Sequence, residues 1–299
     1  MIFLIRLKQI KRDRQEEFSS GLSFYQLTTC LFIRVFPLRV SPFFLAVLVD
    51  SKDSAPSAQH LAASLGIPLV TDPCSATLLL RYSGNGLELC KPEDPSLPGA
   101  LRVDFTSTSV TRRCSGLSQE LLIRATKIRH ASEPVLIDAT AGLGYDGFIL
   151  AAAGFHVHMI EANPVVAALL DDGLERARHH PSLVSVTDRI RLTTGEAQNI
   201  LARRMHHPDV IYLDPMFPQR SKSALVKQEL RLLQLLTAQT ISSPEQLLRQ
   251  ALAARPRKVV VKRPRTGSAL LNLRPSYTVR GKAIRFDVYV GPGTDSVHR

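Results

Sequence analysis

The sequence predicts an α/β protein with a doubly wound, Rossmann-like sheet, and two motifs carry this prediction. The first is residues 135–147, where an apolar run ends in Asp138, turns through two glycines and leads into a second apolar run. This order is typical of the strand, tight turn and helix that open a nucleotide-binding domain. The second is residues 209–218, where a buried strand leads directly into Asp214 and a proline-stiffened turn. Ligands of open α/β sheets bind beyond the carboxyl ends of the strands, so both motifs are expected to line one crevice.

Residues 1–42 have a different pattern from the rest of the chain. They begin with mixed charge, and the apolar residues that follow are interrupted by Arg34, Pro37 and Arg39. No run reaches the roughly 18 apolar residues that a membrane-spanning helix requires, and a signal peptide would need a cleaner apolar core. We therefore expect residues 1–42 to be a disordered extension, and we expect no membrane partner.

Residues 43–104 are predicted to form a small α+β subdomain. Alternating apolar residues indicate short strands, and Ser54 stands at the N-cap position of one amphipathic helix. Gly84-Asn85-Gly86 lies between two of the strands and is a strong signal for a hairpin turn. The expected strands are residues 44–49, 78–82, 87–90 and 101–103, and the expected helix is residues 55–65.

The rest of the chain is predicted to be a linking segment followed by the nucleotide-binding domain. The link is residues 105–130, with a helix expected at 117–128, and the domain is residues 131–299. Further strands of the domain are expected at residues 155–160, 189–193, 209–213 and 258–261.

The residues that end the first two strands of this domain indicate that it binds a nucleoside. Asp138 closes the first strand and is expected to order the glycine turn. Glu161 closes the second strand, about twenty residues past the glycine turn, where a carboxylate can accept hydrogen bonds from both ribose hydroxyls. Enzymes that use NAD share this feature, so Glu161 supports a nucleoside cofactor without naming it.

The segment Asp214-Pro215-Met216-Phe217-Pro218 favours chemistry on a planar base. The carboxylate and the turn carbonyls can accept the hydrogens of an exocyclic amine, while Phe217 can stack on the ring. Methyl transfer to such a nitrogen needs the lone pair drawn out of conjugation, which hydrogen-bond acceptors assist without a strong base. The alternative is an ordinary β-turn after a strand, because Asp-Pro is common in turns.

Charge and cysteine content limit the kinds of partner that the protein can have. The 299 residues carry a net charge of +12, and residues 219–299 hold 16 Lys or Arg against four Asp or Glu. This excess favours an anionic partner such as nucleic acid, although a solvated basic face is the alternative. The four cysteines form no CxxC pair and stand near no histidine cluster at metal-binding spacing. They suit a reducing compartment, and no metal is expected.

Several motifs together resemble the RsmJ family, bacterial methyltransferases that use S-adenosylmethionine to modify a guanine N2 in 16S ribosomal RNA. The resemblance extends from about Leu45 to about Val290, and its motifs are Asp138–Gly144, Glu161–Gly173, Tyr212–Pro218, Lys222–Lys227 and Val259–Pro264. It implies a class I methyltransferase fold with a seven-stranded sheet, S-adenosylmethionine as the cofactor and action in the cytoplasm. It also implies 16S ribosomal RNA, or the small ribosomal subunit, as the partner.

The resemblance implies roles for individual residues. The expected cofactor-binding residues are Asp138, Gly142, Gly144, Tyr145, Asp146, Glu161, Ala162, Glu196, Ala197 and Asp214. The expected catalytic residues are Asp214, Pro215 and Phe217. The expected RNA-binding residues are Arg112, Arg113, Lys222, Lys227, Lys262 and Arg263. The chain departs from the family at Ala162, where a basic residue is common, and at Glu196, where other polar residues are usual.

Two other classes of protein compete with this interpretation. An NAD(P)-dependent oxidoreductase would share the glycine turn and Glu161, but it would have no use for the residues after Asp214. A non-catalytic RNA-binding module with a relic pocket would be expected to have lost residues such as Asp138 and Asp214, which are present.

Overall fold

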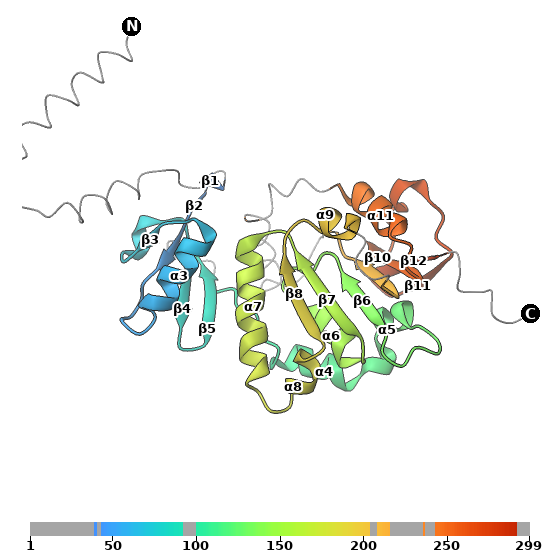
Figure 1. Ribbon diagram of the computed structural model, residues 1–299, viewed down its shortest axis with the longest axis horizontal. Coiled ribbons are helices and arrows are strands. Elements are labelled where there is room, and N and C mark those ends of the chain that lie inside the picture. Colours follow the sequence, from blue (N-terminus) through green and yellow to red (C-terminus); the bar gives the residue numbers. More distant parts are fainter. Residues whose placement is uncertain are drawn as a thin grey trace, which may run out of the picture. The chain divides into compact units, whose positions relative to one another are not determined.

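The computed structural model describes residues 39–40, 43–91, 100–203, 208–215, 236 and 243–291 (Figure 1). The predicted extension of residues 1–42 lies outside them except for Arg39 and Val40. These two residues form strand β1, which pairs antiparallel with Phe43 and Phe44. The N-terminal sheet therefore includes residues that the sequence pattern assigned to the extension. Among the described residues, no helix is both long and apolar enough to cross a bilayer.

The N-terminal sheet has five strands in the order β1-β2-β4-β5, and β3 also pairs with β2. Its elements are β1 (Arg39–Val40), β2 (Phe43–Leu48), α3 (Ala55–Leu65), β3 (Leu69–Val70), the 3-10 turn η1 (Pro73–Ser75), β4 (Leu78–Ser83) and β5 (Gly86–Cys90). Helix α3 begins after Ser54 as predicted, but the Ser54 hydroxyl donates to the Ser51 carbonyl and does not cap the helix. The predicted hairpin is confirmed, because Ser83 and Gly86 form the last pair of β4 and β5. The strand predicted at residues 101–103 is reduced to a single bridge between Leu101 and Leu89.

The second sheet has seven strands in the order β11-β12-β10-β9-β6-β7-β8, which confirms the predicted class I methyltransferase fold. Its strands are β6 (Val135–Asp138), β7 (His156–Glu161), β8 (Ile190–Thr194), β9 (Val210–Leu213), β10 (Lys258–Pro264), β11 (Tyr277–Arg280) and β12 (Ile284–Val290). Six strands run in the same direction, five of them joined by parallel pairing, and β12 runs the opposite way and pairs antiparallel with both β10 and β11. The helices and 3-10 turns are α4 (Thr108–Ser115), η2 (Leu117–Gln119), α5 (Leu121–Thr126), α6 (Tyr145–Ala152), α7 (Pro164–Arg178), α8 (Val184–Thr187), α9 (Ala197–Ala202), α11 (Pro244–Ala253) and η3 (Leu270–Asn272).

Helices cover both faces of the second sheet. Side chains alternate between the faces along a strand, so neighbouring residues enter different apolar clusters. Tyr212 of β9 packs with the cluster that contains Phe148 of α6, whereas Ile211 packs with the cluster that contains Leu248 of α11. All four of these side chains are buried, and the sheet is therefore doubly wound as predicted.

The linking segment differs most from its prediction. Helix α4 was not expected, because its Thr- and Ser-rich sequence has low helix propensity. The helix expected at residues 117–128 is instead the turn η2 and the short helix α5. The break falls at Glu120, whose backbone is extended and whose carboxylate accepts two hydrogen bonds from Arg113. The ion pair between Arg113 and Glu120 therefore lies at the break between η2 and α5.

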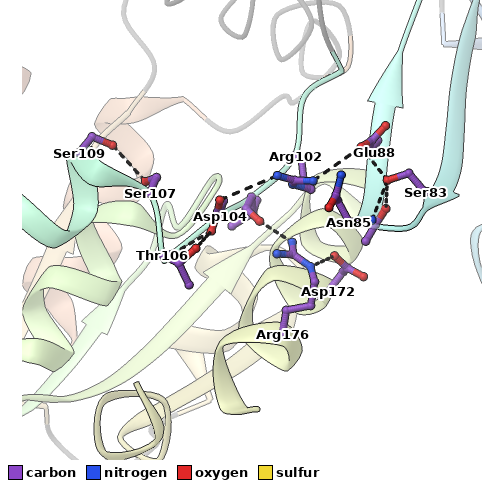
Figure 2. Close-up of polar contacts among 12 residues, drawn as sticks. Ser83, Asn85, Glu88, Arg102, Asp104, Thr106, Ser107, Ser109, Asp172 and Arg176 are labelled. Carbon is purple, nitrogen blue, oxygen red and sulfur yellow. Dashed lines mark hydrogen bonds and ion pairs between the residues drawn. The ribbon is translucent and has the colours of Figure 1, made fainter. Parts of the chain in front are cut away.

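Strand β5 of the N-terminal sheet packs against α7, and Figure 2 shows the polar contacts beside this packing. Arg176 of α7 donates to Asp172 at 2.9 Å and to the Val103 carbonyl. Two glycines allow this close approach, since a Cβ on Gly86 would lie 2.3 Å from Arg176 Nε and a Cβ on Gly173 would lie 2.5 Å from Val103 Cγ1. These contacts hold Val103 against α7, just before the linking segment that leads on to α4 and the candidate site.

Candidate functional site

The glycine turn after β6 leaves backbone exposed to a ligand at one glycine but not at the other. Gly142 and Gly144 both have positive φ angles, 55° and 77°. A Cβ on Gly142 would meet only the Thr140 carbonyl, at 4.0 Å, whereas a Cβ on Gly144 would lie 2.3 Å from Leu170 Cδ1. Gly142 is therefore the position where a ligand can approach the backbone. Gly144 lets the start of α6 pack against the fully buried Leu170 of α7.

Glu161 closes the glycine turn from the end of β7. Its carboxylate accepts hydrogen bonds from the backbone N–H groups of Gly142 and Asn163, each at 2.8 Å. Burial raises the pKa of Glu161, and these N–H groups and that of Ala162 oppose the shift. Each carboxylate oxygen retains acceptor capacity, which suits a diol beside Gly142. Glu196 is exposed at the start of α9 and lies near enough to raise the pKa of Glu161 further.

Asp214 stands directly after β9, next to the glycine turn, as the two sequence motifs predicted. Its backbone N–H donates to Thr140 Oγ1 at 2.6 Å. The following residue, Pro215, is buried. Phe217, the predicted stacking residue, lies outside the described residues, as do Lys222 and Lys227.

Lys262 joins two of the predicted acids. From β10, its Nζ donates to Asp214 Oδ2 at 2.7 Å and to Asp146 Oδ2 at 2.8 Å. Asp146, on the first turn of α6, also accepts from the Tyr212 hydroxyl at 2.8 Å and from Arg113 Nη1 at 3.0 Å. The result is a continuous polar network at the carboxyl edge of the sheet.

The acids of this network differ in protonation. Burial, together with the nearby carboxylates of Asp146, Asp214 and Glu161, raises the pKa of Asp138 to about 8 against the opposing hydrogen bond from the Thr140 N–H. Burial would also raise the pKa of Asp146, but Lys262 and Arg113 hold it down to about 2. For Asp214, burial raises the pKa despite the opposing charge of Lys262. The site therefore contains the firmly ionised carboxylate of Asp146 and the buried carboxyl of Asp138, which is neutral below about pH 8, while the pKa of Asp214 is raised above its ordinary value.

The four predicted RNA-binding residues that the structure describes fall into three groups. Arg112 is exposed on α4, as a phosphate contact would be. Arg113 and Lys262 are instead paired with carboxylates inside the site, so their charges are already compensated. Arg263 is only 7% exposed, and its Nη2 donates to the Ser268 carbonyl. The geometry of these last three side chains differs from that of surface phosphate contacts.

Three residues of the site were not singled out from the sequence. Tyr212 donates to Asp146, Thr140 holds the backbone of Asp214, and Asn163 accepts from the N–H groups of Val165 and Val166 at the start of α7. A tyrosine in the middle of a buried strand is a signal in itself, because a buried hydroxyl needs a partner. An Asn directly before a Pro at the start of a helix is a second signal, because the Asn side chain can cap the helix.

The residues present fit S-adenosylmethionine. Its ribose hydroxyls are donors, which the carboxylate of Glu161 beside the open position at Gly142 can accept. Its ammonium group is a hydrogen-bond donor, and the carboxyl groups of Asp138 and Asp214 carry acceptor oxygens at this edge of the sheet, beside the glycine turn. Tyr145 packs edge-on against Phe105 at the start of α6, with 5.8 Å between the ring centroids. Within the described residues, no group of three or more His, Cys, Asp or Glu side chains could hold a metal ion.

Comparison with known proteins identifies the family to which the chain belongs. Residues 61–291 match the model of a family of SAM-dependent methyltransferases. The ribosomal RNA small subunit methyltransferase J of Thioalkalivibrio sulfidiphilus is 43% identical over 250 residues, which cover 82% of this chain and 97% of the relative. The protein of the same name from Pseudomonas aeruginosa is 40% identical over 248 residues, covering 82% of this chain and 94% of the relative.

A solved structure shows the same fold over nearly the same span. The crystal structure of the SAM-dependent methyltransferase NGO1261 from Neisseria gonorrhoeae matches with a TM-score of 0.64 and 28% identity, covering 85% of this chain and 99% of that one. S-adenosylmethionine is therefore the cofactor of this protein. From its motifs, its sheet and these relatives, the chain belongs to the ribosomal RNA small subunit methyltransferase J family of SAM-dependent methyltransferases.

Proposed function

We propose that this protein transfers a methyl group from S-adenosylmethionine to the exocyclic N2 of a guanine in 16S ribosomal RNA. The observation that supports this most is the position of Asp214. Its carboxylate stands at the end of β9 beside the glycine turn, where an acceptor can meet an amine next to the cofactor. The curated relatives are named as methyltransferases of small-subunit ribosomal RNA, which supports the class of substrate.

The protein contributes to this reaction mainly by positioning the reactants and by placing charge near the reacting nitrogen. When bound, S-adenosylmethionine supplies a methyl group attached to a positively charged sulfur. Held in the site, the cofactor would supply this methyl group to the N2 lone pair, and the electron pair of the broken carbon–sulfur bond would remain on sulfur. Asp214 accepts a hydrogen bond from the amine, offsets the positive charge that develops on nitrogen, and takes the proton that nitrogen then loses. Proximity and preorganised charge of this kind supply most of the acceleration in such a site.

Basic residues outside this network are proposed to bind the RNA backbone. Arg112 is the described candidate, and Lys222 and Lys227 are proposed from the sequence alone. The net charge of +12 supports such contacts, because each neutralised phosphate releases counterions. We propose that the reaction takes place in the cytoplasm, where ribosomal subunits of bacteria are assembled, on 16S ribosomal RNA or on the small subunit.

The test is methylation of RNA from a strain that lacks the gene. Naked 16S ribosomal RNA and intact small subunits are each incubated with the protein and S-adenosylmethionine, with 23S ribosomal RNA as a matched control. Nuclease digestion and mass mapping should find N2-methylguanine at one position of 16S ribosomal RNA, and the faster of the two substrates is the physiological form. Methylation of a different base, or equal methylation of 23S ribosomal RNA, would contradict the proposal.

A further inference from the structure

Lys262 occupies the centre of the polar network and not its surface. Its Nζ lies 2.7 Å from Asp214 Oδ2 and 2.8 Å from Asp146 Oδ2, and the three side chains are 21%, 30% and 18% exposed. An ammonium group has three hydrogens, so two of them are committed to these carboxylates. Asp146 is in turn fixed by Tyr212 and Arg113.

We propose that Lys262 is a positioning residue for methyl transfer, which keeps the carboxylate of Asp214 ionised and oriented so that its second oxygen meets the substrate amine. The proposal rests on the proposed function, since it requires Asp214 to accept from that amine. In the described part of the chain, Oδ1 of Asp214 accepts no hydrogen bond, whereas Oδ2 is held by the lysine. Asp146 anchors the lysine, and Thr140 anchors the backbone of Asp214.

The charges that face Asp214 explain why such a residue is needed. Asp146 on α6, Asp138 on β6 and the Tyr212 hydroxyl on β9 all lie close to it, and Lys262 on β10 is the cation that contacts it among the described residues. Burial raises the pKa of Asp214, Lys262 lowers it, and Asp146 raises it. Without the lysine, burial and the neighbouring carboxylate would both favour the protonated form, which cannot accept the proton from nitrogen.

The lysine is itself held in the charged state. Burial alone would lower its pKa, but the carboxylates of Asp146 and Asp214 raise the pKa of Lys262 well above its ordinary value. Its charge is therefore constant over the pH range in which an enzyme is assayed. This constant positive charge beside Asp214 sets the pH above which the carboxyl group of Asp214 is ionised and can accept a proton.

The experiment is the pH dependence of single-turnover methylation of 16S ribosomal RNA. Lys262→Met removes the charge and keeps a side chain of similar length, whereas Lys262→Arg keeps the charge. An opposite charge at this distance lowers the pKa of a carboxyl by about 1–3 units, so the acid limb of the Lys262→Met profile should move upward by about that much. Lys262→Arg should keep the limb near that of the wild type. Lys258→Met is the matched control, because Lys258 lies on the same strand and its Nζ donates to the Lys127 carbonyl.

A second measurement separates positioning from RNA binding. If Lys262 instead contacted an RNA phosphate, Lys262→Met would raise KM for RNA, weaken its salt dependence and leave the acid limb in place. That result would overturn the proposal. In an Asp214→Asn background Lys262→Met should have no further effect on the pH profile, because the group it tunes is gone. An equal shift in that background would also overturn it.

Failure of the proposed function would be visible separately. Wild-type protein that does not methylate guanine in 16S ribosomal RNA would reject the function itself, whatever the lysine does. Thermal unfolding of each variant checks that it folds. If Lys262→Met does not fold, Lys262→Gln keeps a hydrogen-bond donor for Asp214 without the charge, and the same upward shift of the acid limb is expected.

Discussion

The backbone N–H of Asp214 donates to the side-chain oxygen of Thr140 at 2.6 Å, across 74 residues of sequence. Thr140 lies in the glycine turn after β6, and Asp214 lies directly after β9, its neighbour in the sheet. The turn that is open to the cofactor and the acid proposed to meet the substrate are therefore joined by a hydrogen bond. A shift in one motif moves the other.

The first prediction concerns the charge of Asp214. Asp214→Asn keeps the shape and can still offer an oxygen to the amine, but it loses the negative charge that stabilises the developing cation. A charge-assisted hydrogen bond contributes about 1.5–3 kcal/mol, and each 1.36 kcal/mol is about tenfold in rate. Single-turnover methylation should fall by about ten- to a hundredfold, with much less change in cofactor affinity measured by calorimetry. Turnover near that of the wild type would remove Asp214 from its proposed role.

The second prediction concerns the support that Thr140 gives to Asp214. Thr140→Val has nearly the same shape and removes the acceptor of the Asp214 N–H. A typical hydrogen bond contributes about 0.5–1.5 kcal/mol, so the turnover number should fall several-fold as Asp214 loses its fixed position. KM for RNA should be little changed, because the side chain lies behind the acid. A change in KM alone would show that Thr140 acts on substrate binding instead.

The third prediction separates the two glycines of the turn. Gly144→Ala should lower the free energy of unfolding by about 1–3 kcal/mol for the overlap of its Cβ with Leu170 Cδ1 in a filled core, in addition to the cost of its positive φ. Gly142→Ala has open space and only the cost of a positive φ, about 1–2 kcal/mol. Relative to its effect on stability, Gly142→Ala should weaken the binding of S-adenosylmethionine more than Gly144→Ala does. Urea titration and calorimetry on both variants test this, and the reverse ranking would place the ligand nearer Gly144.

The fourth prediction is a pH dependence of stability that comes from Asp138. Its pKa is raised by burial to about 8 in the folded protein, against about 3.9 in an unfolded chain. Its contribution to stability is therefore fully present below about pH 4 and is lost as the pH rises towards 8, at up to about 1.4 kcal/mol per pH unit. Asp138→Asn should remove that decline when unfolding is measured without cofactor. Parallel pH profiles for the variant and the wild type would show that Asp138 is ionised in the folded state.

The fifth prediction tests Arg112 as an RNA phosphate contact. Arg112→Ala should weaken RNA binding and reduce the slope of log affinity against log salt by about 0.7–0.9, the value for one lost phosphate contact. Arg178→Ala is a suitable control, because Arg178 is paired with Glu175 at 2.7 Å. Equal slopes for Arg112→Ala and the wild type would exclude the contact.

Individual residues show where prediction from the sequence succeeded. Asp138, Glu161 and Asp214 each follow a short apolar run, and parallel strands bring their carboxyl ends to one edge, so their meeting could be expected. The role of Gly144 could not be expected from the sequence. Only the position of α7 shows that the missing side chain of Gly144 makes room for Leu170. Lys262 and Arg113 look like other basic residues in a chain of net charge +12, and nothing local marks them as partners of Asp146.

The sequence by itself determined the doubly wound sheet, the glycine turn and the order of the acids at strand ends, because apolar periodicity and turn residues are local signals. The tertiary structure alone decided which charges are compensated. Arg113 and Lys262 come from α4 and β10, 33 and 116 residues from Asp146, and they reach it only once the sheet is assembled. Burial then sets the pKa of Asp138 and Asp214, since the cost of a charge depends on the atoms packed around it and not on its neighbours in sequence.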